Sequence, residues 1–465
     1  MALPPFHSSC SASTAIHMSK TGLSGSRGPE TMMKSAMINN ALESSYQRYA
    51  VKRPLSEKQH AHARMFLPSG TTRSVLDFDP FPFTVASAAG CHLTDIDGQV
   101  YLDYLGDYSV GLAGHNPEAV REAVASVLEN GWSFGAVAAE EAEVARLLCE
   151  RFESMDLVRF TSSGTEANLA AISLALKSTG RNKLLVFDGG YHGGFLSFSR
   201  GRPSLNVPFD SVICDYNDLE SVREAFRQWP EQIGCVLVEP MLGSGGRIQA
   251  APDFLKGLRA LCDENGSVLV FDEVQTSRMS YGGAQSLLGV RPDLTTLGKY
   301  IGGGFGFGVV GGAEKLMLQI ARGGERSYDH SGTFNNNRFS MAASSAMLGT
   351  VLTRAALDGL FERGEELRKR ADTLLRCHGF QATGWGSLMG IHPTDVSVDR
   401  ASDLAGTDRR PVELLFHELL ERGIYIGKSG FVTLSLPQTT ETDESFLTAL
   451  ESAMQAVSAV SPRLA

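Results

Sequence analysis

Short apolar segments alternate with helical patterns through the middle of this chain, and this alternation constrains the fold more than any other feature. The apolar segments comprise residues 157–161, 183–187, 234–239 and 267–272. Between them lie amphipathic stretches at residues 166–177, 219–228 and 252–264. Runs rich in Val, Leu and Phe are typical of parallel strands that helices cover on both faces. We therefore predict an α/β fold with a mostly parallel central sheet.

The rest of the 465 residues flanks this predicted large domain, which we assign to residues 111–345. Residues 1–40 are rich in Ser and Met and predict a disordered extension, with an organelle transit peptide as the alternative. Residues 41–110 are expected to pack with a smaller α+β domain at residues 346–465. That domain combines a long charged helical pattern at residues 354–377 with short strands and a terminal helix.

Two local patterns refine the prediction for the N-terminal segment. Residues 40–60 have a pattern that fits a helix. In residues 91–104, the dipeptide Asp97-Gly98 separates two short β-prone runs. Asp-Gly favours the tight turn of a hairpin, so we predict two antiparallel strands there.

Charge and cysteine content exclude several classes of protein. The net charge of −10 argues against nucleic acid or an anionic membrane as the main partner. No apolar stretch is long enough to cross a bilayer. The seven cysteines form no CxxC pair, so we predict neither a disulfide framework nor a metal site. Free thiols fit a reducing compartment, and we predict a cytoplasmic location.

One segment has the composition of a phosphate site. Ser163-Gly164-Thr165 directly follows a predicted strand and opens a predicted helix. The free N–H groups and the dipole of a helix N-terminus attract a phosphate, although the same residues also make an ordinary helix cap.

Four further residues are candidates for a ligand site, and two of them, Glu239 and Asp272, stand beyond the carboxyl ends of predicted strands, where an open parallel sheet binds its ligands. Tyr191 follows Gly189-Gly190, Glu239 ends one apolar segment and Asp272 ends the next. Lys299 stands in the apolar, glycine-rich segment 297–304. A buried lysine loses its proton easily and becomes a nucleophilic amine. With an aspartate for a pyridine nitrogen, an aromatic ring and a phosphate site, this set indicates pyridoxal 5′-phosphate.

Taken in order, these motifs resemble those of class III aminotransferases, which are fold type I enzymes dependent on pyridoxal phosphate. The similarity is greatest to the branch that includes glutamate-1-semialdehyde 2,1-aminomutase and β-phenylalanine aminotransferase. It rests on SSGTEAN, GGYHGG, VEP, FDEV, TLGKYIGGG and HSGTFNNN, and it covers about residues 40–460. The resemblance implies a large domain with a mostly parallel sheet, a smaller α+β domain and a homodimer.

The resemblance also implies a role for each motif residue. Lys299 would carry the cofactor as a Schiff base and move the proton, and Asp272 would hold the pyridine nitrogen. Tyr191 would stack on one face of the ring and Val274 on the other, and Glu239 is a further cofactor-binding candidate.

The phosphate of the cofactor would be held from two subunits. Ser163, Gly164 and Thr165 would bind it within one subunit. Thr333, in HSGTFNNN, would reach the phosphate in the neighbouring subunit.

Substrate recognition is implied at Arg73, which stands where this branch carries a carboxylate-binding arginine. A guanidinium suits two-point binding of a carboxylate. The sequence departs from β-phenylalanine aminotransferase near the C-terminus, where Ser429 replaces an arginine and Lys428 stands one residue away. Gln275 and Tyr281 could make the pocket more polar than an aryl pocket.

These observations predict an aminotransferase with a ping-pong mechanism. It would move an amino group from a carboxylated amine, such as a β-amino acid, to a 2-oxo acid. The alternatives are an aminomutase of the semialdehyde type or a racemase on the same scaffold. A protein that binds the cofactor without catalysis is a further alternative, and the intact Lys299, Asp272 and Thr333 argue against it.

Overall fold

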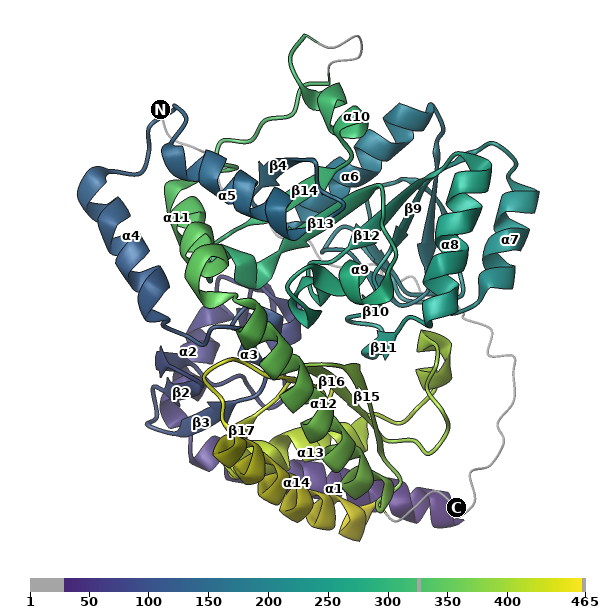
Figure 1. The fold of residues 1–465 in the computed structure, drawn as a ribbon. Coiled ribbons are helices and arrows are strands. Elements are labelled where there is room, and N and C mark those ends of the chain that lie inside the picture. Colours follow the sequence, from purple (N-terminus) through teal and green to yellow (C-terminus); the bar gives the residue numbers. More distant parts are fainter. Residues whose placement is uncertain (1–28, 324–327, 462–465) are drawn as a thin grey trace, which may run out of the picture.

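A seven-stranded sheet forms the centre of the large domain (Figure 1). The computed structural model describes residues 29–323 and 328–461. The strand order is β4-β14-β13-β12-β9-β5-β8. Neighbours from β13 to β8 pair in parallel, whereas β14 is antiparallel to both β13 and β4. The strands are β4 (Leu157–Thr161), β5 (Lys183–Phe187), β8 (Asp210–Cys214), β9 (Ile233–Val238), β12 (Val268–Asp272), β13 (Leu294–Gly298) and β14 (Gly308–Gly312).

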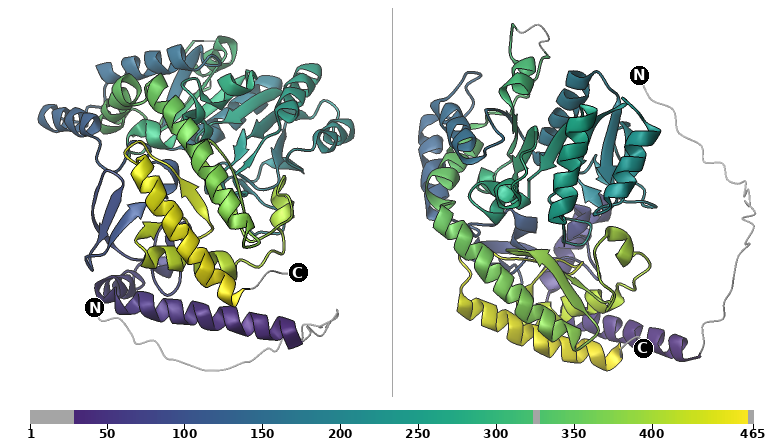
Figure 2. Two further views of the ribbon diagram at one scale, coloured as in Figure 1. Left: turned by 60° about the horizontal axis from the view of Figure 1, so that its bottom comes forward. Right: turned by 45° about the vertical axis from the view of Figure 1, so that its right-hand side comes forward.

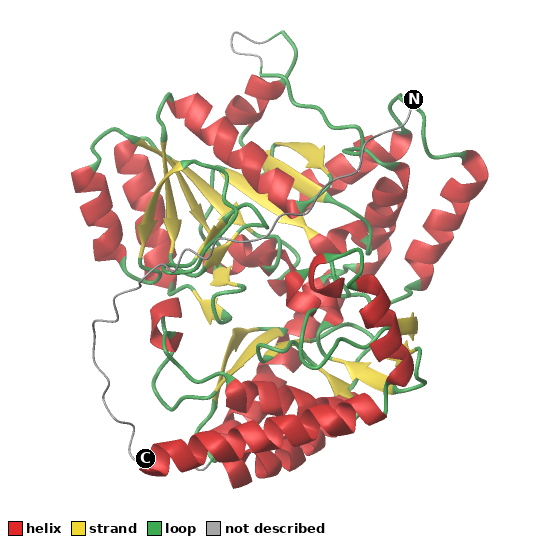
Figure 3. Cartoon of the chain, turned by 180° about the vertical axis from the view of Figure 1, so that it is seen from behind, coloured by secondary structure: helices red, strands yellow, loops and turns green. Residues whose placement is uncertain are grey.

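Helices cover both faces of this sheet (Figure 3). Successive side chains of a strand point to opposite faces. Leu185 and Leu269 accordingly pack in one apolar cluster with residues of α7 (Leu219–Gln228) and α8 (Pro252–Asn265). Leu184, Val186 and Val270 pack on the other side with residues of α6 (Gly164–Thr179). Burial on both faces explains why these strands have uninterrupted apolar sequences, and the predicted α/β fold is confirmed.

The small domain contains a three-stranded antiparallel sheet covered by long helices. Its elements are α12 (Arg354–Arg376), β15 (Gln381–Trp385), β16 (Leu388–His392), α13 (Arg410–Glu421), β18 (Phe431–Thr433) and α14 (Thr440–Val460). The N-terminal segment joins it, because β17 (Ile424–Tyr425) pairs in parallel with β3 (Val100–Asp103). The predicted hairpin is formed by β2 (His92–Asp95) and β3, and β1 (Val85–Ala89) extends it.

The first described helix corrects one prediction. Helix α1 (Pro29–Val51) begins well before residue 40, so a disordered extension over residues 29–40 is wrong; residues 1–28 lie outside the described part of the chain. The helix lies across the small domain (Figure 2). Ile38 is buried in the core, and Arg410 of α13 donates hydrogen bonds to Asn39 and Ser35. Packing against α13 stabilises a helix whose own sequence is weakly amphipathic.

Shorter elements complete the structure. They are α2 (Pro54–Ala63), α3 (Gly106–Ser109), α4 (Glu118–Asn130), α5 (Ala139–Arg151), β6 (Gly190–Tyr191), β7 (Ser197–Phe198), β10 (Met241–Leu242), β11 (Ile248–Gln249), α9 (Gly283–Leu288), α10 (Glu314–Met317) and α11 (Arg338–Ala346). Within the described ranges, no helix combines the length and hydropathy that a membrane span requires.

A glycine of β14 lets the sheet approach the loop before α6. A Cβ atom on Gly308 would stand 2.1 Å from the carbonyl oxygen of Ser163. We expect Gly308→Ala to lower the free energy of unfolding by about 1–3 kcal/mol, because backbone atoms must shift to make room. Thermal unfolding measures the effect.

The matched control is Gly359→Ala on the exposed side of α12, where an added Cβ meets nothing within 4 Å. Alanine favours a helix over glycine by about 0.5–1 kcal/mol, so this change should raise stability slightly. Equal melting temperatures for the two variants would contradict the crowding at Gly308.

Candidate active site

The carboxyl ends of neighbouring strands bring the predicted site residues to one edge of the sheet. Asp272 is the last residue of β12, Glu239 directly follows β9 and Lys299 directly follows β13. Tyr191 stands four residues after the end of β5. Because these strands run parallel, the residues that follow them meet at the same edge.

The carboxylate of Asp272 is buried and accepts hydrogen bonds from three segments. Oδ2 lies 2.8 Å from Nδ1 of His192 and 2.8 Å from Nδ2 of Asn168, and Oδ1 accepts from the backbone N–H of Val274 at 3.0 Å. Thr296 in turn donates to the amide oxygen of Asn168 at 2.6 Å. These donors stabilise the ionised carboxylate in a buried position. It is suited to pair with the N–H of a protonated heterocycle.

Asn168 and His192 have no role in the sequence-based prediction, although both lie inside its motifs. Asn168 is on the second turn of α6 and His192 follows Tyr191. A motif does not show which side chain a polar residue within it contacts in the fold. Only the fold reveals that both side chains converge on Asp272.

Lys299 is poised to act as a neutral amine. Burial, together with the charge of Arg247, lowers the pKa of Lys299 to about 8, although Asp272 opposes the shift. The backbone of Lys299 has a φ of 53°, in the left-handed region that side chains rarely adopt. Strained backbone of this kind persists where the surrounding structure holds it in place, as it does at active sites.

Glu239 holds the loop that carries Tyr191. Its Oε1 accepts from the backbone N–H of Tyr191 at 3.0 Å, and its Oε2 accepts from that of Gly243 at 2.9 Å. Burial raises the pKa of Glu239. Both carboxylate oxygens are therefore engaged with backbone, while the Tyr191 side chain is 42% exposed and free to stack on a ligand.

The N-terminus of α6 faces the same region. Ser163 caps the helix, with its Oγ accepting from the N–H of Glu166 at 3.2 Å. A Cβ atom on Gly164 would stand 2.8 Å from the Val274 side chain, and one on Gly193 would stand 2.1 Å from Oγ1 of Thr165. This close packing places Val274 directly beside the free N–H groups of the first helical turn, which suit a phosphate.

Arg73 lies on a turn that other segments hold. Its Nη1 pairs with Oδ1 of Asp107 at 2.5 Å, and both side chains are nearly half exposed. Asp107, Tyr108 and Ser109 all have φ between 46° and 79°. The Tyr108 hydroxyl donates to the carbonyl of Val75 at 2.8 Å, which fixes the strained stretch to the Arg73 turn.

The structure answers which way Lys428 points. Its ammonium donates to the carbonyls of Ser74 and Asp77, so it supports the Arg73 turn. The carbonyl of Ser429 accepts from Nη2 of Arg409 at 2.7 Å. Lys428 is therefore a brace for Arg73 and not a free cation in place of the missing arginine.

The two residues expected to make the pocket polar have different surroundings. The Tyr281 ring packs between the guanidinium groups of Arg151 and Arg354, 4.6 and 4.9 Å from the ring centre. Gln275 accepts a hydrogen bond from Nη1 of Arg247. Arg247, which motif reasoning missed, therefore joins Gln275 at the site.

Thr333 lies apart from this cluster. It is exposed and lines a surface cavity of about 660 Å³ together with Trp132, Phe134 and Phe334. Across residues 29–323 and 328–461, no group of three His, Cys, Asp or Glu side chains is arranged to hold a metal ion.

The fold and the arrangement of Lys299, Asp272 and α6 define a class of enzyme, the fold type I transferases that work with pyridoxal phosphate. Comparison with known proteins identifies the family. The family model described as aminotransferase class-III matches residues 76–457. The chain belongs to the class III aminotransferases; it is a transaminase, and its cofactor is pyridoxal phosphate.

Individual relatives agree with this assignment. The chain is 43% identical to the β-phenylalanine transaminase of Variovorax paradoxus, over 93% of this chain and all of the relative. The crystal structure of a β-phenylalanine aminotransferase from that organism superposes with a TM-score of 0.87, covering 89% of this chain and 97% of the other. An ω-transaminase from Sphaerobacter thermophilus is 34% identical with a TM-score of 0.82, covering 87% and 98%.

The glutamate-1-semialdehyde aminomutase of Pseudomonas aeruginosa PAO1 shares the fold. Its TM-score is 0.84 at 23% identity, covering 91% of this chain and 99% of that one.

The pKa of Lys299 predicts how the cofactor-free protein captures pyridoxal phosphate. Only the neutral amine attacks an aldehyde, so the rate should rise about tenfold per pH unit below 8 and level off above it. Growth of the visible absorbance band after mixing measures this rate. Nα-acetyl-lysine, whose only amine is the side chain with a pKa of about 10.4, is the control and should delay the plateau by about two pH units. A plateau at the same pH for both would contradict a depressed pKa.

Proposed function

We propose that this transaminase takes the amino group of a β-amino acid or a related carboxylated amine and passes it to a 2-oxo acid in a ping-pong cycle. The supporting observation is Arg73, a guanidinium held by a braced turn and partly open to solvent beside the acidic Asp107. The 43% identity to a transaminase named for β-phenylalanine supports the same class of donor.

The residues of the site fit the cofactor. When bound, pyridoxal phosphate supplies an electron sink and carries the amino group between the two substrates. We assign the phosphate to Ser163, Gly164 and Thr165, where free N–H groups and the helix dipole favour an anion. Tyr191 and Val274 would lie on opposite faces of the ring.

Two residues then supply the charge and the proton transfer. The Asp272 carboxylate, held by Asn168 and His192, would accept a hydrogen bond from the pyridine N–H and so keep the proton on that nitrogen. Lys299 would take a proton from the donor carbon and deliver it to the adjacent carbon of the cofactor. A lowered pKa suits this role, because a base works best when its pKa lies near the working pH.

Binding of the donor requires an exchange of partners at Arg73. Asp107 occupies the guanidinium in the free enzyme, and the substrate carboxylate must take its place. Both groups are nearly half exposed, so water screens the pair and the exchange costs little.

The half-reaction without an acceptor tests this proposal. Adding a β-amino acid to the yellow enzyme should bleach its visible band, and pyruvate or 2-oxoglutarate should restore it. Arg73→Ala should raise the KM for the donor by about 10- to 100-fold, because a charged two-point contact is lost. Lys299→Ala should reduce turnover by about 10²- to 10⁴-fold.

The outcomes separate the alternatives. Isomerisation of an amino aldehyde without any 2-oxo acid, together with no bleaching by any donor, would favour an aminomutase. Undiminished function in Lys299→Ala would favour a non-catalytic binding role.

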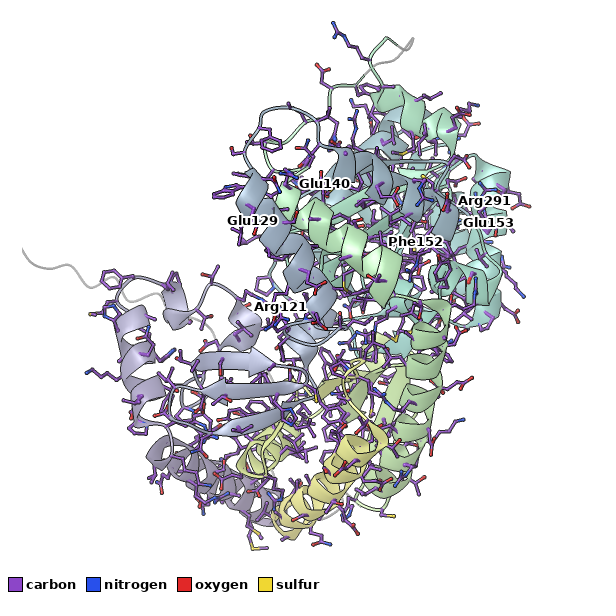
Figure 4. All side chains as sticks on the ribbon, turned by 60° about the vertical axis from the view of Figure 1, so that its left-hand side comes forward. Arg121, Glu129, Glu140, Phe152, Glu153 and Arg291 are labelled. Atoms are coloured by element: carbon purple, nitrogen blue, oxygen red, sulfur yellow. The ribbon has the colours of Figure 1, made fainter. Side chains whose placement is uncertain are left out.

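We further propose a homodimer whose contact includes the cavity around Thr333. Exposed apolar side chains gather there, with Trp132 and Phe134 50% exposed, Phe334 66% and Val137 84%. Glu129 and Glu140 border the connection between α4 and α5 (Figure 4). Large exposed aromatic groups are typical of protein contacts. In this proposal Thr333 binds the phosphate of the partner's cofactor.

A charge on this surface should weaken the dimer. We expect Phe334→Glu to shift the protein towards a monomer with low activity, because burying an unpaired carboxylate opposes association. Leu205→Glu is the control; it alters an equally exposed leucine outside the surface, 78% exposed. Light scattering coupled to gel filtration measures the mass. An unchanged dimer with Phe334→Glu would contradict this contact.

We also propose the domain boundaries near residues 110 and 345 and a cytoplasmic location. The location is supported by Cys91, Cys149, Cys214, Cys235 and Cys262, which form no disulfide within the described ranges.

A further inference from the structure

Arg247 is a buried cation with no carboxylate at ion-pair distance among the described residues, and Glu239 is the acid whose charge acts on it. It is 2% exposed and stands in the tight connection between β10 and β11, with a φ of 55°. Among the described residues its guanidinium donates to Oε1 of Gln275, its Nε is buried without a partner, and no carboxylate lies within ion-pair distance. Taking an unpaired charge out of water is costly, so such a group marks a place for an anion.

The position of Arg247 relates it to the active site. The connection begins at Gly243, four residues after Glu239, whose carboxylate accepts from the N–H of Gly243 at 2.9 Å. Of the charged groups that act on Lys299, Arg247 has the largest effect. Its guanidinium also lies over the ring of Phe431, 4.9 Å from the ring centre, close to the strand that follows Ser429.

The two substrates of the proposed reaction need different carboxylate sites. In a β-amino acid one carbon separates the reacting carbon from the carboxylate. In a 2-oxo acid the carboxylate is attached directly to the reacting carbon. If the reacting carbon is fixed beside Lys299, the two carboxylates cannot occupy one position. The proposed function assigns the carboxylate of the β-amino acid, which lies one carbon farther from the reacting carbon, to Arg73 on the turn beside Asp107.

We propose that Arg247 binds the carboxylate of the 2-oxo acid acceptor. This inference rests on the proposed transaminase cycle and names the residue that recognises its second substrate. Gln275 orients the guanidinium through Nη1, and the Phe431 ring supports its face, so Nε and the remaining nitrogen are directed to the ligand as a fork. In this proposal Arg73 binds the carboxylate of the donor and Arg247 binds the carboxylate of the acceptor.

Separate half-reactions test this assignment. We expect Arg247→Gln to slow bleaching by the β-amino acid only through the lost charge beside Lys299, and therefore less than it slows the reaction with pyruvate. Recovery of the band with subsaturating pyruvate should slow by about 10- to 100-fold, the loss expected for a charged two-point contact. Acetaldehyde, which is pyruvate with a hydrogen in place of its carboxylate, should lose no more rate in Arg247→Gln than the β-amino acid does. Arg247→Lys should recover part of the pyruvate rate, because it keeps the charge without the fork.

A binding measurement keeps the test independent of turnover. Propanoate, titrated by calorimetry into enzyme loaded with pyridoxamine phosphate, should bind to wild type and about 10- to 100-fold more weakly to Arg247→Gln. If no β-amino acid bleaches wild type, the proposed donor fails, and the propanoate titration still decides the role of Arg247.

Two results would overturn the inference. Equal losses for donor, pyruvate and acetaldehyde in a correctly folded, yellow Arg247→Gln would make Arg247 a structural support. A selective loss with pyruvate in Arg409→Gln, but not in Arg247→Gln, would assign the acceptor to the cation that contacts the Ser429 carbonyl.

Discussion

The burial of the Asp272 carboxylate is the constraint on which the rest of the site depends. A lone carboxylate at the end of a buried strand would take up a proton or destabilise the fold. Donors from α6, from the Tyr191 loop and from its own turn prevent this. Since Thr296 fixes the asparagine among these donors, four separate segments are held in register by one charge. Any ligand that meets Asp272 meets a preorganised acceptor.

Three basic side chains of the site differ in how far they are exposed to solvent. Burial lowers the pKa of Lys299 and makes this side chain easier to deprotonate, Arg247 is buried and charged, and Arg73 is partly exposed and already paired. The depth of each group decides what it can do. A lysine that deprotonates easily can transfer protons. A guanidinium shielded from water is suited to distinguish between ligands, as proposed for Arg247, whereas an exposed guanidinium such as that of Arg73 exchanges ionic partners readily.

Much of the fold could be predicted because the large-domain strands are continuous apolar runs, which burial on both faces demands. Strands β13 and β14 are harder to predict, since their glycines and threonines lack this signature. Residues 29–40 form a helix through contacts with α13, which lies far along the chain. Motifs identified Asp272 and Lys299, but not Asn168, His192 or Arg247, whose importance comes from contacts that spacing does not encode. The orientation of the Lys428 side chain likewise depends on the backbone path of residues 74–77, whose carbonyl groups it contacts.

The pairing of β3 with β17 has a consequence for how the protein is made. Leu102 lies opposite Ile424, and the Tyr104 hydroxyl bonds to Asp443 across 339 residues of sequence. During synthesis the N-terminal hairpin therefore leaves the ribosome long before its partners exist. The edge of the hairpin remains unpaired until β17 has been synthesised, and contacts between residues so far apart in the sequence form slowly. The large domain can collapse first, but the turn that bears Arg73 becomes braced only after Lys428 has been added. The substrate site proposed at Arg73 is thus among the last features that the growing chain acquires.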